Sequence, residues 1–151
     1  MAAQKNDGVR EMAVRYTGPR RKANAGLITR PEAAASLARK FLPMDEGREA
    51  FGVILLDGRH QPTGFHVVSV GTVNQSIVHP RETFRAAVVD GSVAIILTHN
   101  HPSGDTQPSE EDRSVTSRLV RAGKVLGIEV LDHLVVTDDG YYSFKEHGEI
   151  Q

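Results

Sequence analysis

The sequence predicts a single α/β domain in which helices cover a β-sheet. The chain has 151 residues, enough for one domain with a substantial core and too few for two of ordinary size. Stretches typical of strands alternate with stretches of helical pattern, as expected for an α/β fold. The stretch 92–99 (SVAIILTH) is continuously apolar. It is therefore predicted to be a central strand that is covered on both faces.

The other elements follow in order along the chain. Residues 1–10 are predicted to be disordered, and 11–17 is a candidate strand. A helix is expected from Pro31, a residue favoured in the first turn, to about Phe41. The remaining expected elements are strands 49–57 and 64–73, a helix over 80–90, strand 92–99, a helix over 109–124, and strands 127–137 and 141–144. Strands 49–57 and 64–73 are predicted to pair as a hairpin, and so are the last two strands, around the turn signal Asp138-Asp139-Gly140.

Charge divides the chain into two parts. Residues 1–40 carry nine Lys or Arg against three acids, and residues 41–151 carry nine against sixteen. We predict that 1–30 is a flexible basic arm and that 31–151 is the folded domain. The local cluster Arg20, Arg21 and Lys22 is either a solvated arm or a contact for nucleic acid or an acidic partner. No aromatic residue is interleaved there to stack on bases, so nucleic-acid binding is expected to be weak.

The composition excludes several classes of chemistry. The chain has no cysteine, which removes disulfides, thiol nucleophiles and thiolate metal sites. Any metal must therefore be held by nitrogen and oxygen ligands. The apolar stretches are too short to span a membrane, and the N-terminus lacks the apolar core of a signal peptide. We expect a cytoplasmic protein with no membrane partner.

Two histidines follow the predicted central strand and lie one residue apart. Side chains two apart on a strand point the same way, so His99 and His101 are expected to share a face. The helix after them has a predicted buried stripe that consists of Val115, Leu119, Ala122 and Leu126. Asp112 lies three residues before Val115 and extends this stripe inward. A buried carboxylate needs a partner, and a divalent cation would supply one. Two His and one Asp leave one position of a tetrahedral zinc ion open for water.

Simpler explanations exist for the same residues. A His-x-His pair is often two hydrogen-bonded loop histidines. Ser109 is a good N-cap, and Asp112 then occupies the third helical position, where a carboxylate can complete the cap. Capping does not exclude metal binding, because the helix N-terminus helps keep Asp112 ionised.

The spacing of these residues resembles a known motif. His99-x-His101, seven residues, Ser109, two residues and Asp112 is similar to the JAMM motif, the metalloprotease signature of JAB/MPN domains. Three ordered stretches, GTVNQSIVHPRETFRAA, THNHPSGDTQPSEED and VLDHLVV, together look like a RadC-type JAB domain. The resemblance covers roughly residues 45–148. It implies a single-domain JAB/MPN (cytidine-deaminase-like) fold with a curved mixed sheet flanked by helices, so 31–151 is expected to be that domain.

The resemblance also implies roles for individual residues. One zinc ion per chain would be held by His99, His101 and Asp112, with a water as fourth ligand. Glu49, just before AFGVILLD, stands where the family has its general base, and Glu46 is the nearest competitor. Ser109 matches the residue that helps to stabilise the tetrahedral oxyanion.

A further pair of polar residues interrupts an apolar strand. Asp132 and His133 lie within LDHLVV, so one of them is expected to face a polar site. Either could hydrogen-bond a ligand imidazole, or the two could form a satisfied structural pair.

The functional hypothesis is a JAMM-type zinc metallopeptidase that cleaves a peptide or isopeptide bond in a protein or peptide substrate. The alternative is a DNA-associated RadC-like module of a family labelled DNA repair, with a structural or vestigial metal site. A metal-dependent nuclease is a third candidate. Longer RadC-like chains carry an N-terminal helix-hairpin-helix region. Residues 1–44 are too short and wrongly patterned for it, so a DNA role that depends on that region is not expected.

Overall fold

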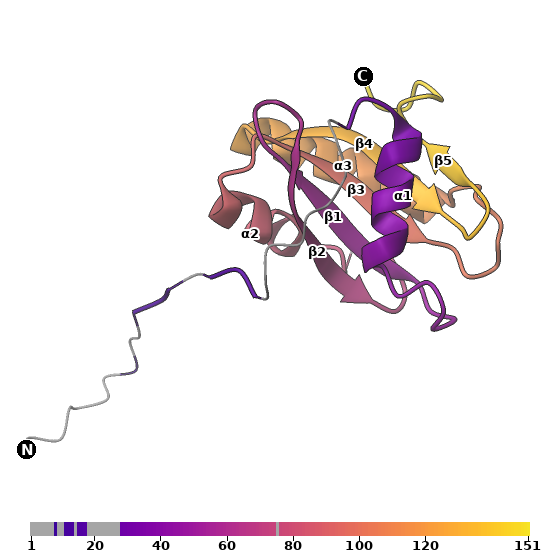
Figure 1. Ribbon diagram of the computed structural model, residues 1–151, viewed down its shortest axis with the longest axis horizontal. Coiled ribbons are helices and arrows are strands. Elements are labelled where there is room, and N and C mark those ends of the chain that lie inside the picture. The colour runs from indigo at the N-terminus through magenta and orange to yellow at the C-terminus, as the bar shows by residue number, and fades with distance from the viewer. Residues whose placement is uncertain (1–7, 9–10, 14, 18–27, 75) are drawn as a thin grey trace, which may run out of the picture.

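A five-stranded mixed β-sheet forms the centre of the molecule (Figure 1). The computed structural model describes residues 8, 11–13, 15–17, 28–74 and 76–151. The strands are β1 (Ala50–Leu56), β2 (Pro62–Val70), β3 (Ala94–Asn100), β4 (Glu129–Val136) and β5 (Tyr141–Ser143). The helices are α1 (Pro31–Phe41), α2 (Pro80–Asp90) and α3 (Glu110–Leu126). The predicted α/β fold with a mixed sheet and flanking helices is confirmed.

Strand β3 lies in the middle of the sheet, as its apolar sequence predicts. The strand order is β2-β1-β3-β4-β5, and all seven residues of β3 are buried. β3 pairs with β1 in antiparallel orientation and with β4 in parallel orientation. Both predicted hairpins, β1–β2 and β4–β5, are present. The parallel β3–β4 pair requires a crossover, and α3 provides it.

Two apolar layers cover the sheet, one on each face. Along β1, Phe51, Val53 and Leu55 join the cluster that includes buried residues of α2 and α3. The alternate residues Ile54 and Leu56 join the cluster that includes α1. Figure 1 shows the same arrangement, with α1 in front of the sheet and α3 behind it. This alternation follows from the two-residue period of a strand.

Local signals explain where the helices begin and end. α1 starts with Pro31 in its first turn, and its last turn contains Arg39. The Arg39 guanidinium donates to the carbonyls of Thr137 and Gly140, both at 2.8 Å, which holds α1 against the β4–β5 turn. α3 ends at Gly127, whose left-handed φ of 71° is readily adopted by glycine.

Two sequence expectations are wrong. Residues 11–13 and 15–17 of the candidate strand 11–17 are irregular, because neither edge strand of the sheet, β2 or β5, pairs with them. Leu126, expected in the buried stripe of α3, is 50% exposed because the helix ends there. Gly123 is buried in its place. The basic cluster Arg20, Arg21 and Lys22 lies outside the described residues, as does most of the predicted disordered stretch 1–10.

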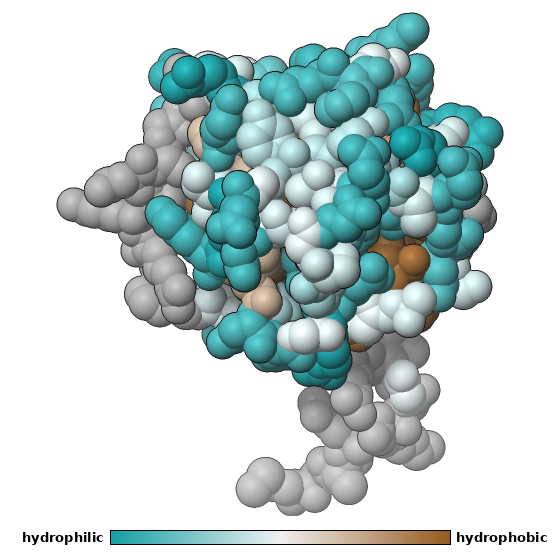
Figure 2. All heavy atoms as spheres, turned by 90° about the vertical axis from the view of Figure 1, so that its right-hand side faces the viewer, coloured by the Kyte–Doolittle hydropathy of each residue, from teal (hydrophilic) through white to brown (hydrophobic). Residues whose placement is uncertain are grey.

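Within the described ranges, no helix is both long enough and apolar enough to cross a bilayer. Figure 2, a view from the β5 side, shows a face covered mostly by hydrophilic and neutral residues, with small hydrophobic areas between them.

Gly123 allows α3 to pack closely on the start of β4, and this contact is testable. A Cβ at position 123 would lie 2.4 Å from the backbone oxygen of Ile128. Overpacking of this kind costs about 1–3 kcal/mol, against a gain in helix propensity of about 1 kcal/mol. We expect Gly123→Ala to lower the melting temperature by several degrees. Ser117→Ala, on the exposed side of the same helix, is the control and should change it little. An unchanged melting temperature in both variants would contradict the close packing.

Candidate metal centre

His99, His101 and Asp112 converge at the carboxyl end of β3. His99 is the second-last residue of β3, and His101 follows the strand directly. Asp112 is in the first turn of α3. One ligand-type atom from each lies within 4.8 Å of the others. The two Nε2 atoms are 3.0 Å apart. The Asp112 carboxylate oxygens lie 3.4 Å from Nε2 of His99 and 3.3 Å from Nε2 of His101. The three residues thus form a group that could hold a metal ion.

The opposite ring nitrogen of each histidine is held by the protein. His101 Nδ1 lies 2.8 Å from the carbonyl oxygen of Asp105, an acceptor, so Nδ1 carries the proton of the neutral ring. His99 Nδ1 lies 2.8 Å from Nε2 of His133. In both residues Nε2 is the atom that faces the centre.

A buried hydrogen-bond chain fixes which nitrogen of His99 carries its proton. The hydroxyl of Thr116 donates to the carbonyl of Asp112 at 2.7 Å, so its oxygen accepts from Nδ1 of His133 at 2.5 Å. Burial, reinforced by His99, holds the pKa of His133 well below its usual value, so this ring is neutral. Its Nε2 is then an acceptor, and His99 Nδ1 must donate to it. His99 Nε2 is left unprotonated toward His101 and Asp112, which is the state that binds a metal.

Asp112 is ionised despite its burial. Burial raises the pKa of this carboxyl, but its contacts with His101 and His99, which stabilise the ionised form when either ring carries a proton on Nε2, and the hydrogen bond from the Ser109 backbone N–H outweigh burial and bring the pKa well below its usual value. The contact with Asp112 in turn raises the pKa of His101. With both rings neutral and protonated on Nδ1, two ring nitrogens and a carboxylate present lone pairs to one point. Nitrogen and oxygen donors of this kind suit a divalent ion such as zinc.

The same aspartate closes the N-terminus of α3. The side chain of Ser109 accepts from the backbone N–H of Asp112 at 3.0 Å, and Asp112 accepts from the backbone N–H of Ser109 at 2.8 Å. The predicted cap is therefore present together with the metal-ligand geometry. Ser109 is exposed, and its hydroxyl hydrogen is not used by the cap.

Glu49 lies beside this group although it is fifty residues away in sequence. It directly precedes β1, which pairs with β3, and its Oε1 lies 3.9 Å from His101 Nε2. Its Oε2 accepts from the backbone N–H of Val73 at 3.2 Å. Glu46, in contrast, is exposed and forms an ion pair with Arg48 at 2.7 Å. The fold therefore brings Glu49 to the candidate centre and directs the Glu46 carboxylate to Arg48.

Comparison with known proteins identifies the family. A family model described as the RadC-like JAB domain matches residues 28–149. The chain belongs to the RadC-like JAB domain family.

Several bacterial and archaeal proteins are similar to this chain. It is 57% identical over 100 residues to a UPF0758 protein of Symbiobacterium thermophilum, a match that covers 66% of this chain and 43% of that protein. It is 46% identical over 137 residues to a UPF0758 protein of Pelobacter propionicus, covering 91% of this chain and 59% of that one. A UPF0758 protein of Methanosarcina mazei is 46% identical over 107 residues, 71% of this chain and 47% of its own. The chain thus spans about half the length of these relatives.

The two polar residues that interrupt β4 of the JAB domain have different surroundings. His133 contacts His99, as described above. The carboxylate of Asp132 accepts from the backbone N–H groups of His133 and Lys145 at 2.7 and 3.0 Å, and from the Ser143 hydroxyl at 2.5 Å. Burial raises the pKa of Asp132 against these hydrogen bonds. Asp132 thus joins β4 to the segment after β5 and has no described contact with a candidate ligand.

Asn100, between the two histidines, was missed by the sequence analysis, as was Thr116 behind His133. Asn100 is 1% exposed, and its side chain bonds to the backbone of residues 48 and 50, on either side of Glu49. Its only signal in the sequence is that a polar amide follows a continuously apolar strand. Which backbone groups this amide meets depends on the pairing of β3 with β1.

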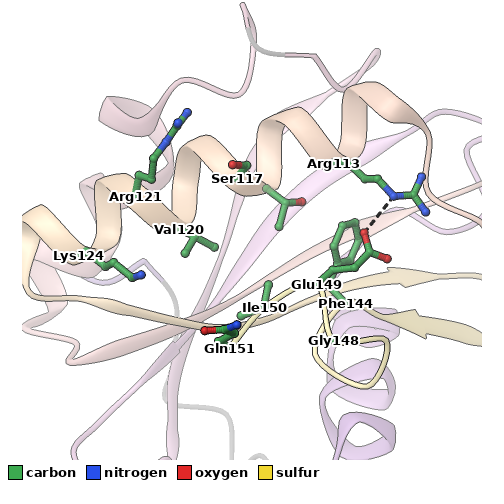
Figure 3. A pocket seen from close by; sticks show the side chains of 11 residues that line it. Arg113, Ser117, Val120, Arg121, Lys124, Phe144, Gly148, Glu149, Ile150 and Gln151 are labelled. Carbon is green, nitrogen blue, oxygen red and sulfur yellow. Dashed lines mark hydrogen bonds and ion pairs between the residues drawn. The ribbon is translucent and has the colours of Figure 1, made fainter.

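A hollow in the JAB domain lies away from the candidate ligands. It has a volume of about 320 Å³ and runs between α3 and the C-terminal residues (Figure 3). Figure 3 shows Arg113, at one end, paired with Glu149, and Arg121 and Lys124 toward the other. None of the clustered residues His99, His101 and Asp112 lines it. Thr116, a member of the hydrogen-bond chain behind His99, does line it.

The hydrogen-bond chain behind His99 can be tested by metal affinity. We expect His133→Gln to weaken Zn²⁺ binding about 10–100-fold, because the orientation and proton position of His99 are no longer fixed. Asp132→Asn changes the neighbouring buried residue and should leave the affinity nearly unchanged. Competition with a chromophoric chelator measures both. Equal affinities for His133→Gln and the parent would contradict a role for this chain in metal binding.

Proposed function

We propose that this protein is a zinc-dependent hydrolase of the JAMM metallopeptidase type that cleaves a peptide or isopeptide bond with a metal-activated water. The observation that carries the proposal is the carboxylate of Glu49, which lies beside the candidate metal ligands. A cluster of ligands alone would fit a structural metal. A nearby carboxylate whose two oxygens are not both engaged adds a group that can move a proton.

The proposed zinc ligands are His99 Nε2, His101 Nε2 and the Asp112 carboxylate. Three protein ligands leave a tetrahedral ion one open position, as in catalytic rather than structural sites. When bound, the ion activates a water for attack and polarises a substrate carbonyl. The fixed Nδ1 contacts of both histidines support this assignment, because they keep the Nε2 lone pairs directed at the centre.

Glu49 is the proposed general base. Its Oε2 is engaged by the Val73 N–H, which orients the carboxylate and leaves Oε1 on the side of His101. In the proposed mechanism Glu49 accepts a proton from the attacking water and delivers it to the leaving amine. This second transfer matters most for amide and isopeptide bonds, whose nitrogen is a poor leaving group until it is protonated.

Ser109 is the proposed donor to the developing oxyanion. Its oxygen accepts from the Asp112 N–H, so the position of the hydroxyl is set by the helix cap. The hydroxyl hydrogen can then be donated to the carbonyl oxygen of a substrate as negative charge builds on it. The exposure of Ser109 makes this donor accessible from outside the protein.

The metal assignment predicts a loss of zinc without loss of the fold. We expect His99→Ala and Asp112→Ala to abolish stoichiometric zinc binding, since each removes one of three ligands, while both apolar layers remain. His66→Ala changes an exposed histidine on β2 and is the matched control. Elemental analysis and circular dichroism measure content and folding. Zinc content equal to that of the parent in both ligand variants would refute the assignment.

The general base predicts a rate loss at constant metal content. Glu49→Gln keeps the shape and a hydrogen-bonding group but accepts no proton. We expect kcat to fall about 10²–10⁴-fold with unchanged zinc content. The measurement uses zinc-loaded protein and the best substrate from a fluorogenic library of peptides and isopeptide-linked lysine peptides. Glu46→Gln is the control and should be nearly silent. Equal rates for Glu49→Gln and the parent, or a parent inactive on the whole library, would count against the proposal.

A further inference from the structure

We infer that Asn100 is a positioning residue that holds Glu49 in place beside the metal ligands. The inference rests on the proposed function, in which Glu49 is the general base. Asn100 is the last residue of β3 and lies between the two candidate ligands His99 and His101.

The side-chain amide of Asn100 bridges β3 to the segment that carries Glu49. Its Oδ1 accepts from the backbone N–H of Ala50 at 2.7 Å. Its Nδ2 donates to the backbone carbonyl of Arg48 at 3.0 Å. The two backbone groups lie on either side of Glu49, so both peptide units next to this residue are held by one amide.

The bridge is needed because the pairing of β1 with β3 does not reach Glu49. The register of β1 on β3 starts with Phe51 opposite His99, so residues 48–50 lie beyond the ladder. On the other side, the carbonyl of Glu49 accepts from Gly71 at 2.6 Å, and its side chain accepts from Val73. Among the described residues, the remaining hydrogen bonds of this segment run to the β2 side, so without Asn100 it would move away from β3 more easily.

Asparagine suits this position for a simple chemical reason. The bridge requires one acceptor and one donor on the same short side chain. Aspartate offers acceptors only and would face the Arg48 carbonyl with a negative oxygen. Serine has a single oxygen and cannot span both groups. Asn100 lies between His99 and His101 in the sequence. The bridge therefore fixes the position of Glu49 relative to both candidate ligands.

A neighbouring residue provides a matched control. The buried hydroxyl of Thr98 donates to the carbonyl of Gly52 at 3.0 Å, a second side-chain contact from β3 to the β1 backbone. Thr98→Val removes this bond at nearly constant volume and leaves the peptide units beside Glu49 untouched. Asn100→Ser removes the bridge. Asn100→Asp keeps the acceptor for Ala50 and loses the donor to Arg48.

The first measurement is amide hydrogen exchange on the zinc-loaded protein, and it needs no substrate. We expect Asn100→Ser to speed exchange of the Ala50 and Val73 amides about tenfold, the effect of losing one hydrogen bond, and Thr98→Val to leave them unchanged. Asn100→Asp should speed exchange of the same amides, because it loses the hydrogen bond to the Arg48 carbonyl. If Asn100→Ser does not fold, Asn100→Asp is used in its place. Unchanged exchange, or equal changes in the Thr98 and Asn100 variants, would overturn the inference.

The second measurement is a double-mutant cycle on the cleaved substrate. Asn100→Ser should lower kcat about tenfold at unchanged zinc content and nearly unchanged KM, and should have no further effect in the Glu49→Gln background. Equal losses in both backgrounds would mean a general structural role and would overturn the inference. If Glu49→Gln itself loses no rate, the proposed function fails, while the exchange experiment still decides whether Asn100 holds the segment.

Discussion

The hydrogen bond between His99 Nδ1 and His133 Nε2 is the contact on which the candidate centre depends. His133 is fully buried and neutral, and its other nitrogen is committed to Thr116. The proton of His99 must therefore lie on Nδ1, and its Nε2 lone pair must face Asp112. If His133 donated and His99 Nδ1 accepted, the neutral His99 ring would carry its proton on Nε2. That proton would point at the centre, and Nε2 could not bind a metal.

The sheet topology brings three distant parts of the chain to this point. The antiparallel neighbour β1 places Glu49 beside the end of β3. The parallel neighbour β4 requires a crossover, and the crossover helix α3 begins where β3 ends, which brings Asp112 to the two histidines. β4 itself carries His133 behind His99. Each neighbour of the central strand thus contributes one polar group to the centre.

Several residues at the site combine a structural role with a proposed chemical one. Asp112 completes the cap of α3 with Oδ2, the same atom that lies 3.3 Å from Nε2 of His101. The cap fixes the Asp112 side chain before any ion binds, which lowers the entropy lost on binding. Asn100 similarly extends the β1–β3 pairing and holds the segment of Glu49. Stability and geometry are therefore coupled at the carboxyl end of β3.

Much of the fold and of the ligand set follows from local sequence. The continuous apolar run of 92–99 predicts a central strand, and the helical stripe through Val115 and Leu119 predicts that Asp112 points inward. These signals are local, because strand and helix periods fix which face a side chain occupies. The same reasoning fails at Leu126, because the end of α3 exposes it, and at 11–17, because a strand needs a neighbour with which to pair.

The remaining contacts were decided by tertiary structure. The sequence alone named Asp132 and His133 together, and only the packing of β4 against β3 and α3 sends His133 to His99 and Asp132 to Ser143. The sequence offered no signal for the partners of Asn100. These partners are backbone groups about fifty residues away, and every residue type except proline has the same backbone groups. Strand register sets such contacts, and register is a property of the assembled sheet.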